Sequence, residues 1–174
     1  GFMLLFTRKF YQTFQNQQQK LWQKDESITE LRGKTVLIVG LGHIGKEVAR
    51  LSRCFGAEVF TVDKKETPEY LNEMLPRADF VVLCLPYTKE THHFFRKEHL
   101  AKMKPTAVLV NIGRGSLVNE KELIEALQKG IIKGAALDVT ETEPLPKESP
   151  LWDMENVIIT PHHSGLSEKY MDRA

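Results

Sequence analysis

The sequence predicts an α/β protein built on a Rossmann-type, doubly wound parallel sheet with helices on both faces. Short apolar runs rich in β-branched residues alternate with segments of helical periodicity. The run at residues 35–39 leads directly into the pattern G-x-G-x-x-G, after which apolar residues recur at helical spacing. The run at residues 80–85 is apolar throughout, as expected of a strand whose two faces are both covered. Such a sheet binds its ligands at the carboxyl ends of its strands.

The glycine pattern is typical of a dinucleotide site. Gly40 lets the chain turn, Gly42 lets the backbone approach a pyrophosphate, and Gly45 lets the helix pack against the strand. The N-terminus of that helix would direct N–H groups and a partial positive charge at the phosphates. Asp63 follows the next apolar run, about 20 residues further on, where a carboxylate is expected to bind the ribose 2′-hydroxyl.

Capping residues mark the boundaries of the later helices: Gly56, Thr67 with Pro68, Asn119 with Glu122, and Gly130. The other expected elements are a strand at 58–62, a weaker helix at 97–103, and strands at 107–111, 134–137 and 157–160. Residues 140–156 form a proline-containing connection that is longer than compact domains usually allow without a functional reason. We expect Leu151 and Trp152 to attach it to the body of the domain.

Composition and charge point to a small-molecule partner. The chain has 174 residues, with 24 basic and 23 acidic side chains and a net charge of +1, so no strong field recruits nucleic acid or an anionic membrane. Cys54 and Cys84 fall within an expected helix and strand, which favours a reducing, cytoplasmic setting over a disulfide framework. No apolar run near the start is long enough to span a bilayer. Histidine and cysteine spacing predicts no metal site.

Residues 1–24 predict one amphipathic helix, because aromatic residues recur every four positions at Phe2, Phe6, Phe10 and Phe14. This apolar stripe requires a cover, which could be the chain's own sheet, a second copy of the chain or another domain. We therefore divide the chain into a helix and connector at 1–30, a dinucleotide-binding domain at 31–166 and a return segment at 167–174.

Polar residues that can carry out chemistry follow the later strands. Arg114 could hold a carboxylate or polarise a carbonyl, and His162 could exchange a proton near neutral pH. A carboxylate from Asp138, Glu141 or Glu143 could orient that histidine. The alternatives are a solvated loop arginine and a capping or packing histidine. His92, His93 and His99 are interpreted as surface residues, and Lys64 and Lys65 as a solvated turn.

These motifs and several others resemble the D-isomer-specific 2-hydroxyacid dehydrogenase family, and specifically its NAD-binding domain. The likeness lies in Leu31-Arg32-Gly33-Lys34-Thr35, the glycine pattern at 40–45, Asp63, Leu85-Pro86-Tyr87-Thr88 with Glu90-Thr91, Asn111-Ile112-Gly113-Arg114-Gly115, Gly134-Ala135-Ala136-Leu137-Asp138-Val139, Glu143-Pro144-Leu145-Pro146 and Thr160-Pro161-His162. Residues 146–160 most resemble the glyoxylate/hydroxypyruvate reductase-like branch. Thr140, where an aromatic is common, and His163, where an aliphatic is common, depart from the pattern.

The resemblance implies specific site roles. Arg114 would orient the substrate, His162 would be the acid/base, and Glu143 would be its partner carboxylate. With the residues already assigned, the implied cofactor site comprises Gly40, Gly42, His43, Ile44, Gly45, Asp63, Leu85, Pro86, Ile112, Gly113, Arg114, Asp138 and His162. The resemblance also implies a substrate domain outside this chain and a homodimer contacted through the N-terminal helix.

The resulting hypothesis is an NAD-dependent oxidoreductase that interconverts small 2-oxo acids and D-2-hydroxy acids. The isolated segment is then expected to bind NAD but to turn over poorly, because one wall of the cleft is missing. An NAD-sensing interaction module of the corepressor type remains an alternative, since it could keep the same three residues. The NAD domain of a homocysteine-forming hydrolase explains the glycines but not the spacing of Arg114, Glu143 and His162.

Asp63 predicts that the protein prefers NADH to NADPH. Its carboxylate can accept a hydrogen bond from a free ribose 2′-hydroxyl, whereas it repels a 2′-phosphate. Fluorescence titration with each reduced dinucleotide measures the two dissociation constants. Tighter binding of NADPH would contradict this interpretation of Asp63.

Overall fold

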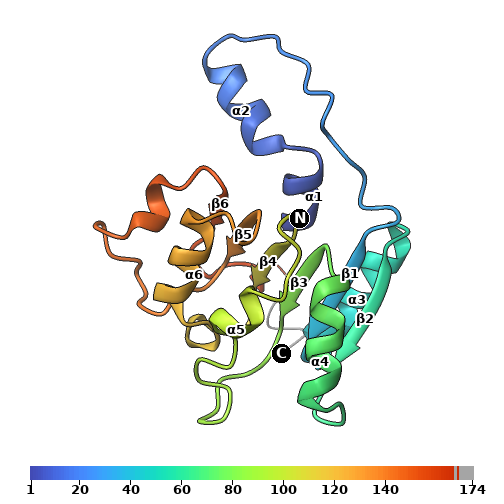
Figure 1. The fold of residues 1–174 in the computed structure, drawn as a ribbon. Coiled ribbons are helices and arrows are strands. Elements are labelled where there is room, and N and C mark those ends of the chain that lie inside the picture. Colours follow the sequence, from blue (N-terminus) through green and yellow to red (C-terminus); the bar gives the residue numbers. More distant parts are fainter. Residues whose placement is uncertain (167, 169–174) are drawn as a thin grey trace.

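The computed structural model describes residues 1–166 and 168 and confirms the predicted fold class. Six strands form one parallel sheet in the order β2-β1-β3-β4-β5-β6 (Figure 1). The strands are β1 Thr35–Val39, β2 Glu58–Val62, β3 Phe80–Leu83, β4 Val108–Asn111, β5 Gly134–Leu137 and β6 Val157–Ile159. β2 lies on one side of β1, and the next strand along the chain, β3, lies on the other side, so the strand order reverses at β1. The crevice for a ligand is therefore expected at the carboxyl ends of β1 and β3.

Helices cover both faces of the sheet, because successive strand residues point to opposite sides. Leu37 and Val39 belong to the apolar cluster with α4, α5 and α6, whereas Val36 and Ile38 belong to the cluster with α3 and α1. The helices are α1 Phe2–Thr7, α2 Phe10–Gln18, α3 His43–Cys54, α4 Pro68–Met74, α5 Lys97–Leu100 and α6 Glu120–Gln128. Three short 3₁₀ helices are η1 Leu75–Arg77, η2 Gly115–Leu117 and η3 Pro150–Asp153.

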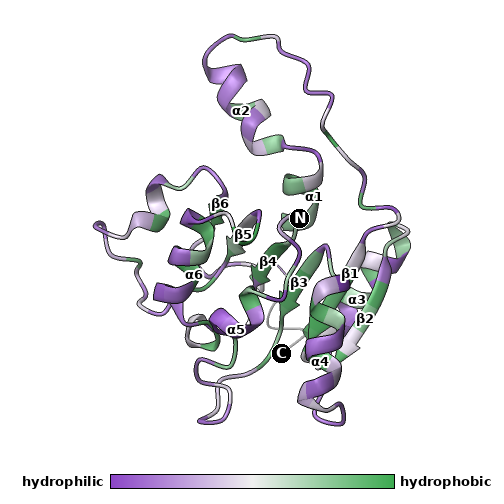
Figure 2. Cartoon of the chain, viewed as in Figure 1, coloured by the Kyte–Doolittle hydropathy of each residue, from purple (hydrophilic) through white to green (hydrophobic). Residues whose placement is uncertain are grey.

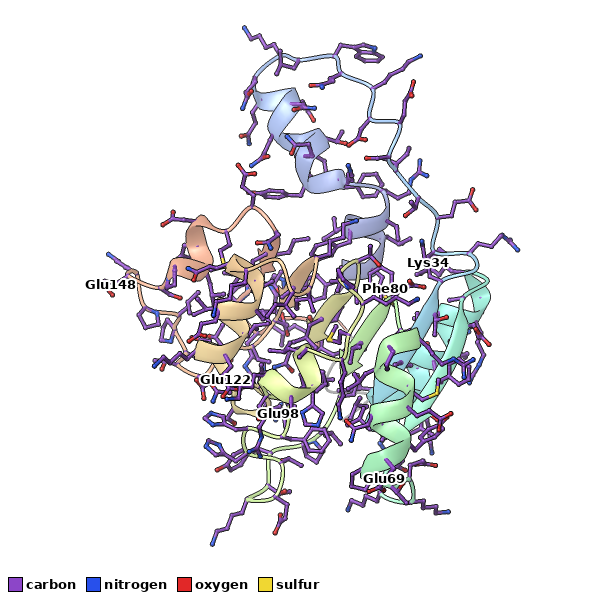
Figure 3. All side chains as sticks on the ribbon, in the orientation of Figure 1. Lys34, Glu69, Phe80, Glu98, Glu122 and Glu148 are labelled. Atoms are coloured by element: carbon purple, nitrogen blue, oxygen red, sulfur yellow. The ribbon has the colours of Figure 1, made fainter. Side chains whose placement is uncertain are left out.

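The expected caps are present. The Thr67 hydroxyl accepts a hydrogen bond from the Tyr70 N–H, and the Asn119 side chain accepts one from the Glu122 N–H. The carboxylate of Glu122 in turn accepts a hydrogen bond from the Lys97 N–H, which joins α6 to the start of α5. Glu98 and Glu122 accordingly lie on adjacent helices in Figure 3. The α5 helix ends at Leu100, three residues earlier than predicted.

The N-terminal segment is two short helices, so the prediction of one continuous helix is wrong. Lys9 separates them in a left-handed conformation with φ of 49°, and its amine lies 2.7 Å from a carboxylate oxygen of Asp25. Phe6 packs on the sheet beside Gly134, but Phe14, on α2, is 56% exposed. The apolar stripe is thus divided, because α2 extends beyond the body of the domain (Figures 1 and 2).

The two ends of the sheet have different surroundings. Lys34 and Phe80, at the amino ends of β1 and β3, lie near the α1–α2 arm, whereas Glu69 lies at the opposite end (Figure 3). The long connection after β5 is attached by Leu151, which is buried, while Trp152 is half exposed and donates its indole N–H to the Pro146 carbonyl at 2.9 Å. Among the described residues, no helix has the length and apolar character needed to cross a membrane.

We expect Gly45→Ala to lower the free energy of unfolding by about 2 kcal/mol, as overpacking in a tight contact does. Its added Cβ would lie 2.0 Å from the Gly40 carbonyl oxygen, which outweighs the ~1 kcal/mol that alanine gains over glycine in a helix. Urea denaturation measures the change. Gly42→Ala is the matched control, because its Cβ meets nothing within 4 Å. Equal stability of the two variants would contradict the expected clash.

Candidate active site

The glycine turn joins β1 to α3 and contacts the loop after β3. Gly40 has φ of 100°, and a Cβ there would lie 2.9 Å from the backbone carbonyl of Cys84. Gly45 sits in the first turn of α3 against Gly40. Gly42 has open space where its Cβ would be, and it starts α3 without a side-chain cap. Packing within the protein therefore requires glycine at positions 40 and 45. Of the three glycines of the motif, only Gly42 leaves room for a ligand such as a pyrophosphate.

The residues around this turn fit the pyrophosphate and ribose of a dinucleotide. The start of α3 offers backbone N–H groups and the positive end of a helix dipole. His43 and Ile44 are exposed in that first turn, and Asp63 directly follows β2, the neighbour of β1. The arrangement can thus bind an anion at the turn and a hydroxyl at Asp63.

Arg114 is held on a turn whose backbone is packed on both sides. The buried side chain of Asn111 donates to the Arg114 carbonyl at 2.9 Å and accepts from the Gly113 N–H at 3.2 Å. A Cβ at Gly113 would lie 2.7 Å from the Leu85 carbonyl oxygen, and one at Gly115 would lie 1.9 Å from that of Thr140. The turn is therefore wedged between the loops after β3 and β5, with the Arg114 side chain exposed.

His162 and Glu143 form the predicted pair. The Nδ1 atom of His162 lies 2.8 Å from one carboxylate oxygen of Glu143, and the other oxygen accepts the Thr140 N–H at 3.2 Å. No hydrogen bond to Nε2 of His162 occurs within residues 1–166 and 168, so this nitrogen is available to a substrate. His162 has φ of 52°, a left-handed conformation that costs a non-glycine residue on the order of 1–2 kcal/mol. Strain of this kind is common at functional sites.

Asp138 anchors the loop that carries His162. Its buried carboxylate accepts hydrogen bonds from the Thr160 hydroxyl at 2.5 Å and from the N–H groups of His163 and Ser164, each at 3.0 Å. Its carbonyl accepts the His162 N–H. Burial by itself raises the pKa of Asp138, but these hydrogen bonds together hold the pKa below its ordinary value. Asp138 therefore stays ionised and determines where His162 lies.

A cavity of about 540 Å³ opens beside the histidine and carboxylate pair. Its lining is largely apolar and comes from the ends of β5 and β6 and the long connection, namely Asp138, Thr140, Glu143, Pro144, Leu145, Trp152, Ile159, Thr160, Pro161 and His162. Leu85, Pro86, Ile112 and Gly113 lie instead on the loops after β3 and β4, toward the glycine turn. His162 thus lies beside the cavity, whereas these four predicted cofactor residues follow β3 and β4.

Three features were not predicted from the sequence. His93 pairs through Nε2 with Glu141, and His99 stacks on Phe95 with 5.1 Å between ring centroids, so these two histidines are partly buried, whereas His92 is exposed as expected of a surface residue. Burial lowers the pKa of His99. Asn111 organises the arginine turn, a role that only its position at the end of an apolar strand could have suggested. Within the described residues, no three His, Cys, Asp or Glu side chains gather as metal ligands.

The structure combines a parallel sheet and its glycine turn with an acidic residue after β2 and a histidine paired with a carboxylate. This combination is typical of the dinucleotide-binding domain of a dehydrogenase. Residues 1–164 match the family described as D-isomer specific 2-hydroxyacid dehydrogenase, NAD binding domain. The chain belongs to this family. The predicted resemblance is therefore confirmed over nearly the whole sequence, and NAD is the cofactor that this type of domain binds.

Relatives of known name are dehydrogenases and reductases. Glyoxylate reductase of Korarchaeum cryptofilum is 42% identical over 154 residues, which cover 83% of this chain and 46% of the relative. A D-isomer specific 2-hydroxyacid dehydrogenase of Lactobacillus delbrueckii ssp. bulgaricus, solved in its NAD-complexed form, gives a TM-score of 0.85 at 30% identity over 97% of this chain and 59% of that one.

A probable 2-hydroxyacid dehydrogenase of Rhizobium etli, solved with NADP, HEPES and L(+)-tartaric acid, gives a TM-score of 0.87 at 31% identity over 98% of this chain and 58% of that one. The likeness thus includes proteins solved with either dinucleotide. The chain spans less than half the length of the curated relatives it matches.

We expect Asp138→Asn to destabilise the fold at pH 7 by about 1–3 kcal/mol, because hydrogen bonds to a charged acceptor weaken. A carboxylate whose pKa is depressed in the fold stabilises it above the unfolded pKa of about 3.9, and this contribution is lost as pH falls through the lower folded pKa. The difference between wild type and variant should therefore shrink below about pH 4. Urea denaturation at pH 7 and pH 3 checks this, and an unchanged difference would contradict it.

Proposed function

We propose that the protein containing this domain is an NAD-dependent oxidoreductase that interconverts small 2-oxo acids and D-2-hydroxy acids. The observation that carries the proposal is the hydrogen bond between His162 and Glu143, which leaves Nε2 of the histidine free beside a cavity. Family membership supports the same reaction class, since the relative with 42% identity is named a glyoxylate reductase.

The chemistry divides between cofactor and protein. A bound nicotinamide supplies or accepts the hydride. In the reductive direction, protonated His162 gives a proton from Nε2 to the oxygen of the substrate's carbonyl, and in the oxidative direction it takes that proton back. Glu143 binds Nδ1–H, which fixes the tautomer and the orientation of the ring. Glu143 therefore acts through His162 and not on the substrate.

Arg114 would bind the substrate carboxylate. Its guanidinium is permanently charged and can make two parallel hydrogen bonds to a carboxylate, which orients a 2-oxo acid better than a point charge does. The turn that carries Arg114 contacts Thr140, and the Thr140 N–H holds Glu143. This short series of contacts connects the substrate-binding group to the proton-transfer pair.

We also propose that the protein forms a homodimer and is cytoplasmic. Phe14 and Trp22, which are 56% and 97% exposed, support a homodimer contact through the α1–α2 arm. The free thiols Cys54 and Cys84 support a reducing, cytoplasmic compartment. An NAD-sensing module of the corepressor type has no support from the named relatives reported above, and the turnover assay below separates it from an enzyme.

In the full-length protein, we expect His162→Ala to lower kcat with glyoxylate, hydroxypyruvate or pyruvate by about 10²–10⁴-fold, the usual contribution of a general acid. NADH affinity should change only a few-fold, because the variant keeps the glycine turn. Steady-state kinetics and NADH titration measure the two quantities. An equal loss in both would contradict the acid/base role.

Two comparisons complete this experiment. Glu143→Gln should lower kcat less than His162→Ala, and Glu148→Gln, an exposed carboxylate of the same connection that projects outward in Figure 3, should leave kcat unchanged. Wild-type protein that reduces none of the three 2-oxo acids would overturn the proposed function and favour the interaction module.

A further inference from the structure

A second histidine–carboxylate pair lies on the carboxyl side of the sheet. Nε2 of His93, in the loop after β3, contacts a carboxylate oxygen of Glu141, in the loop after β5. Both side chains are about one-third exposed. Glu141 and Glu143 thus belong to one loop, and each holds a different histidine. The proton-transfer mechanism uses only the pair formed by Glu143.

His93 also joins the loop after β3 to the arginine turn through its backbone. Its N–H donates to the Ser116 carbonyl at 2.7 Å, two residues beyond Arg114. Phe95, which is fully buried, donates its N–H to the Leu117 carbonyl at 2.8 Å and forms a parallel bridge with Val118. The segment containing His93 therefore runs alongside the segment that follows Arg114.

The backbone of His93 adopts a left-handed conformation that is uncommon for a non-glycine residue. Its φ is 48°, in the left-handed region that favours glycine. Lys9, Lys20, His93 and His162 are the described non-glycine residues with positive φ, and only the two histidines follow strands of the sheet. Both of them bind a glutamate of the same loop. In this conformation the N–H of His93 meets Ser116 and its imidazole meets Glu141.

Charged and aromatic groups lie next to the pair. The Glu141 N–H donates to a carboxylate oxygen of Glu120 at 3.0 Å, and the pKa of Glu120 is raised by burial and, to a smaller extent, by the charge of Glu141. His92 stacks on His93 with 4.0 Å between centroids, and Arg96 donates to the His93 carbonyl at 3.2 Å. His93 thus supplies a donor to a carboxylate that lies beside a second carboxylate.

The pair bridges the arginine turn from one side to the other. On one side His93 binds Ser116, and on the other Thr140, the neighbour of Glu141, lies against Gly115. We propose that His93 and Glu141 are positioning residues that clamp the Arg114 turn, so that its guanidinium meets the carboxylate of a 2-oxo acid in a fixed orientation. This inference rests on the proposed function, because it assigns Arg114 to the substrate.

A purely structural role predicts a different outcome from a positioning role. If the pair only stabilised the fold, its removal would lower the melting temperature and leave the kinetic constants of the remaining folded enzyme unchanged. If it positions Arg114, its removal raises KM for the 2-oxo acid at unchanged NADH affinity. The effect must also vanish when Arg114 is absent, since the pair then has nothing to position.

The test uses the full-length protein and His93→Gly. Glycine accepts φ of 48° without strain, so this variant removes the imidazole while keeping the backbone conformation. We expect KM for glyoxylate or hydroxypyruvate to rise about tenfold, which corresponds to about 1.4 kcal/mol, with NADH affinity within twofold. His93→Gln, whose amide can donate to Glu141, should restore most of the loss. In an Arg114→Ala background, His93→Gly should have no further effect on KM.

Lys20→Gly is the matched control, because Lys20 has φ of 59° and lies on the arm after α2. It should leave KM unchanged. Hydrogen exchange of the peptide containing Ser116 provides a readout independent of turnover, and His93→Gly should speed it.

Faster hydrogen exchange with an unchanged KM would overturn the positioning role while leaving the proposed function intact. The same conclusion would follow if His93→Gly raised KM equally in the presence and absence of the Arg114 side chain. Wild-type protein without turnover on any 2-oxo acid would instead remove the proposed function and this inference with it.

Discussion

The structure depends on backbone-to-backbone contacts between loops at the carboxyl end of the sheet. A Cβ at Gly40, Gly113 or Gly115 would lie within 3 Å of a backbone atom in the neighbouring loop. Because protein interiors are close-packed, these loops can meet only where side chains are missing. The loops after β1, β3, β4 and β5 therefore form one contiguous row. The groups that we propose to bind cofactor and substrate take their positions from this row.

The loops after β4, β5 and β6 carry the residues proposed for catalysis. Thr140 touches the arginine turn, and the residues after it extend one carboxylate to His93 and another to His162. Asp138 holds the His162 loop by three hydrogen bonds, so the strained conformation of that histidine is maintained by its surroundings. One short segment after β5 thereby contacts the arginine turn, the His162–Glu143 pair proposed for proton transfer, and the His93–Glu141 bridge. The α1–α2 arm lies at the other end of the sheet and takes no part in these contacts.

Sequence patterns succeeded where a residue's neighbours are close along the chain. The caps at Thr67 and Asn119 depend on residues three positions away, and both side chains accept the expected N–H, although the Glu122 carboxylate binds Lys97 and does not close a capping box. The aromatic stripe failed for the opposite reason. Its period is helical throughout, but Phe6 has the sheet beneath it while Phe14 lies beyond the edge, and the chain breaks at Lys9 between them. Sequence periodicity predicts which residues share one face of a helix, but it does not predict how far the sheet that covers this face extends.

The sequence alone predicted the α/β class and the glycine turn with its acidic residue after β2. These follow from local preferences and from the rule that parallel strands bring their carboxyl ends together. The roles of Arg114, Glu143 and His162 came instead from the resemblance to a known family. Only the tertiary structure showed that Glu141 takes His93, that Asp138 anchors the histidine loop, and that Gly113 and Gly115 wedge the arginine turn. Each of these contacts joins residues from different strand ends, and their partners are chosen by the register of the sheet and the packing of its loops, which no local pattern contains.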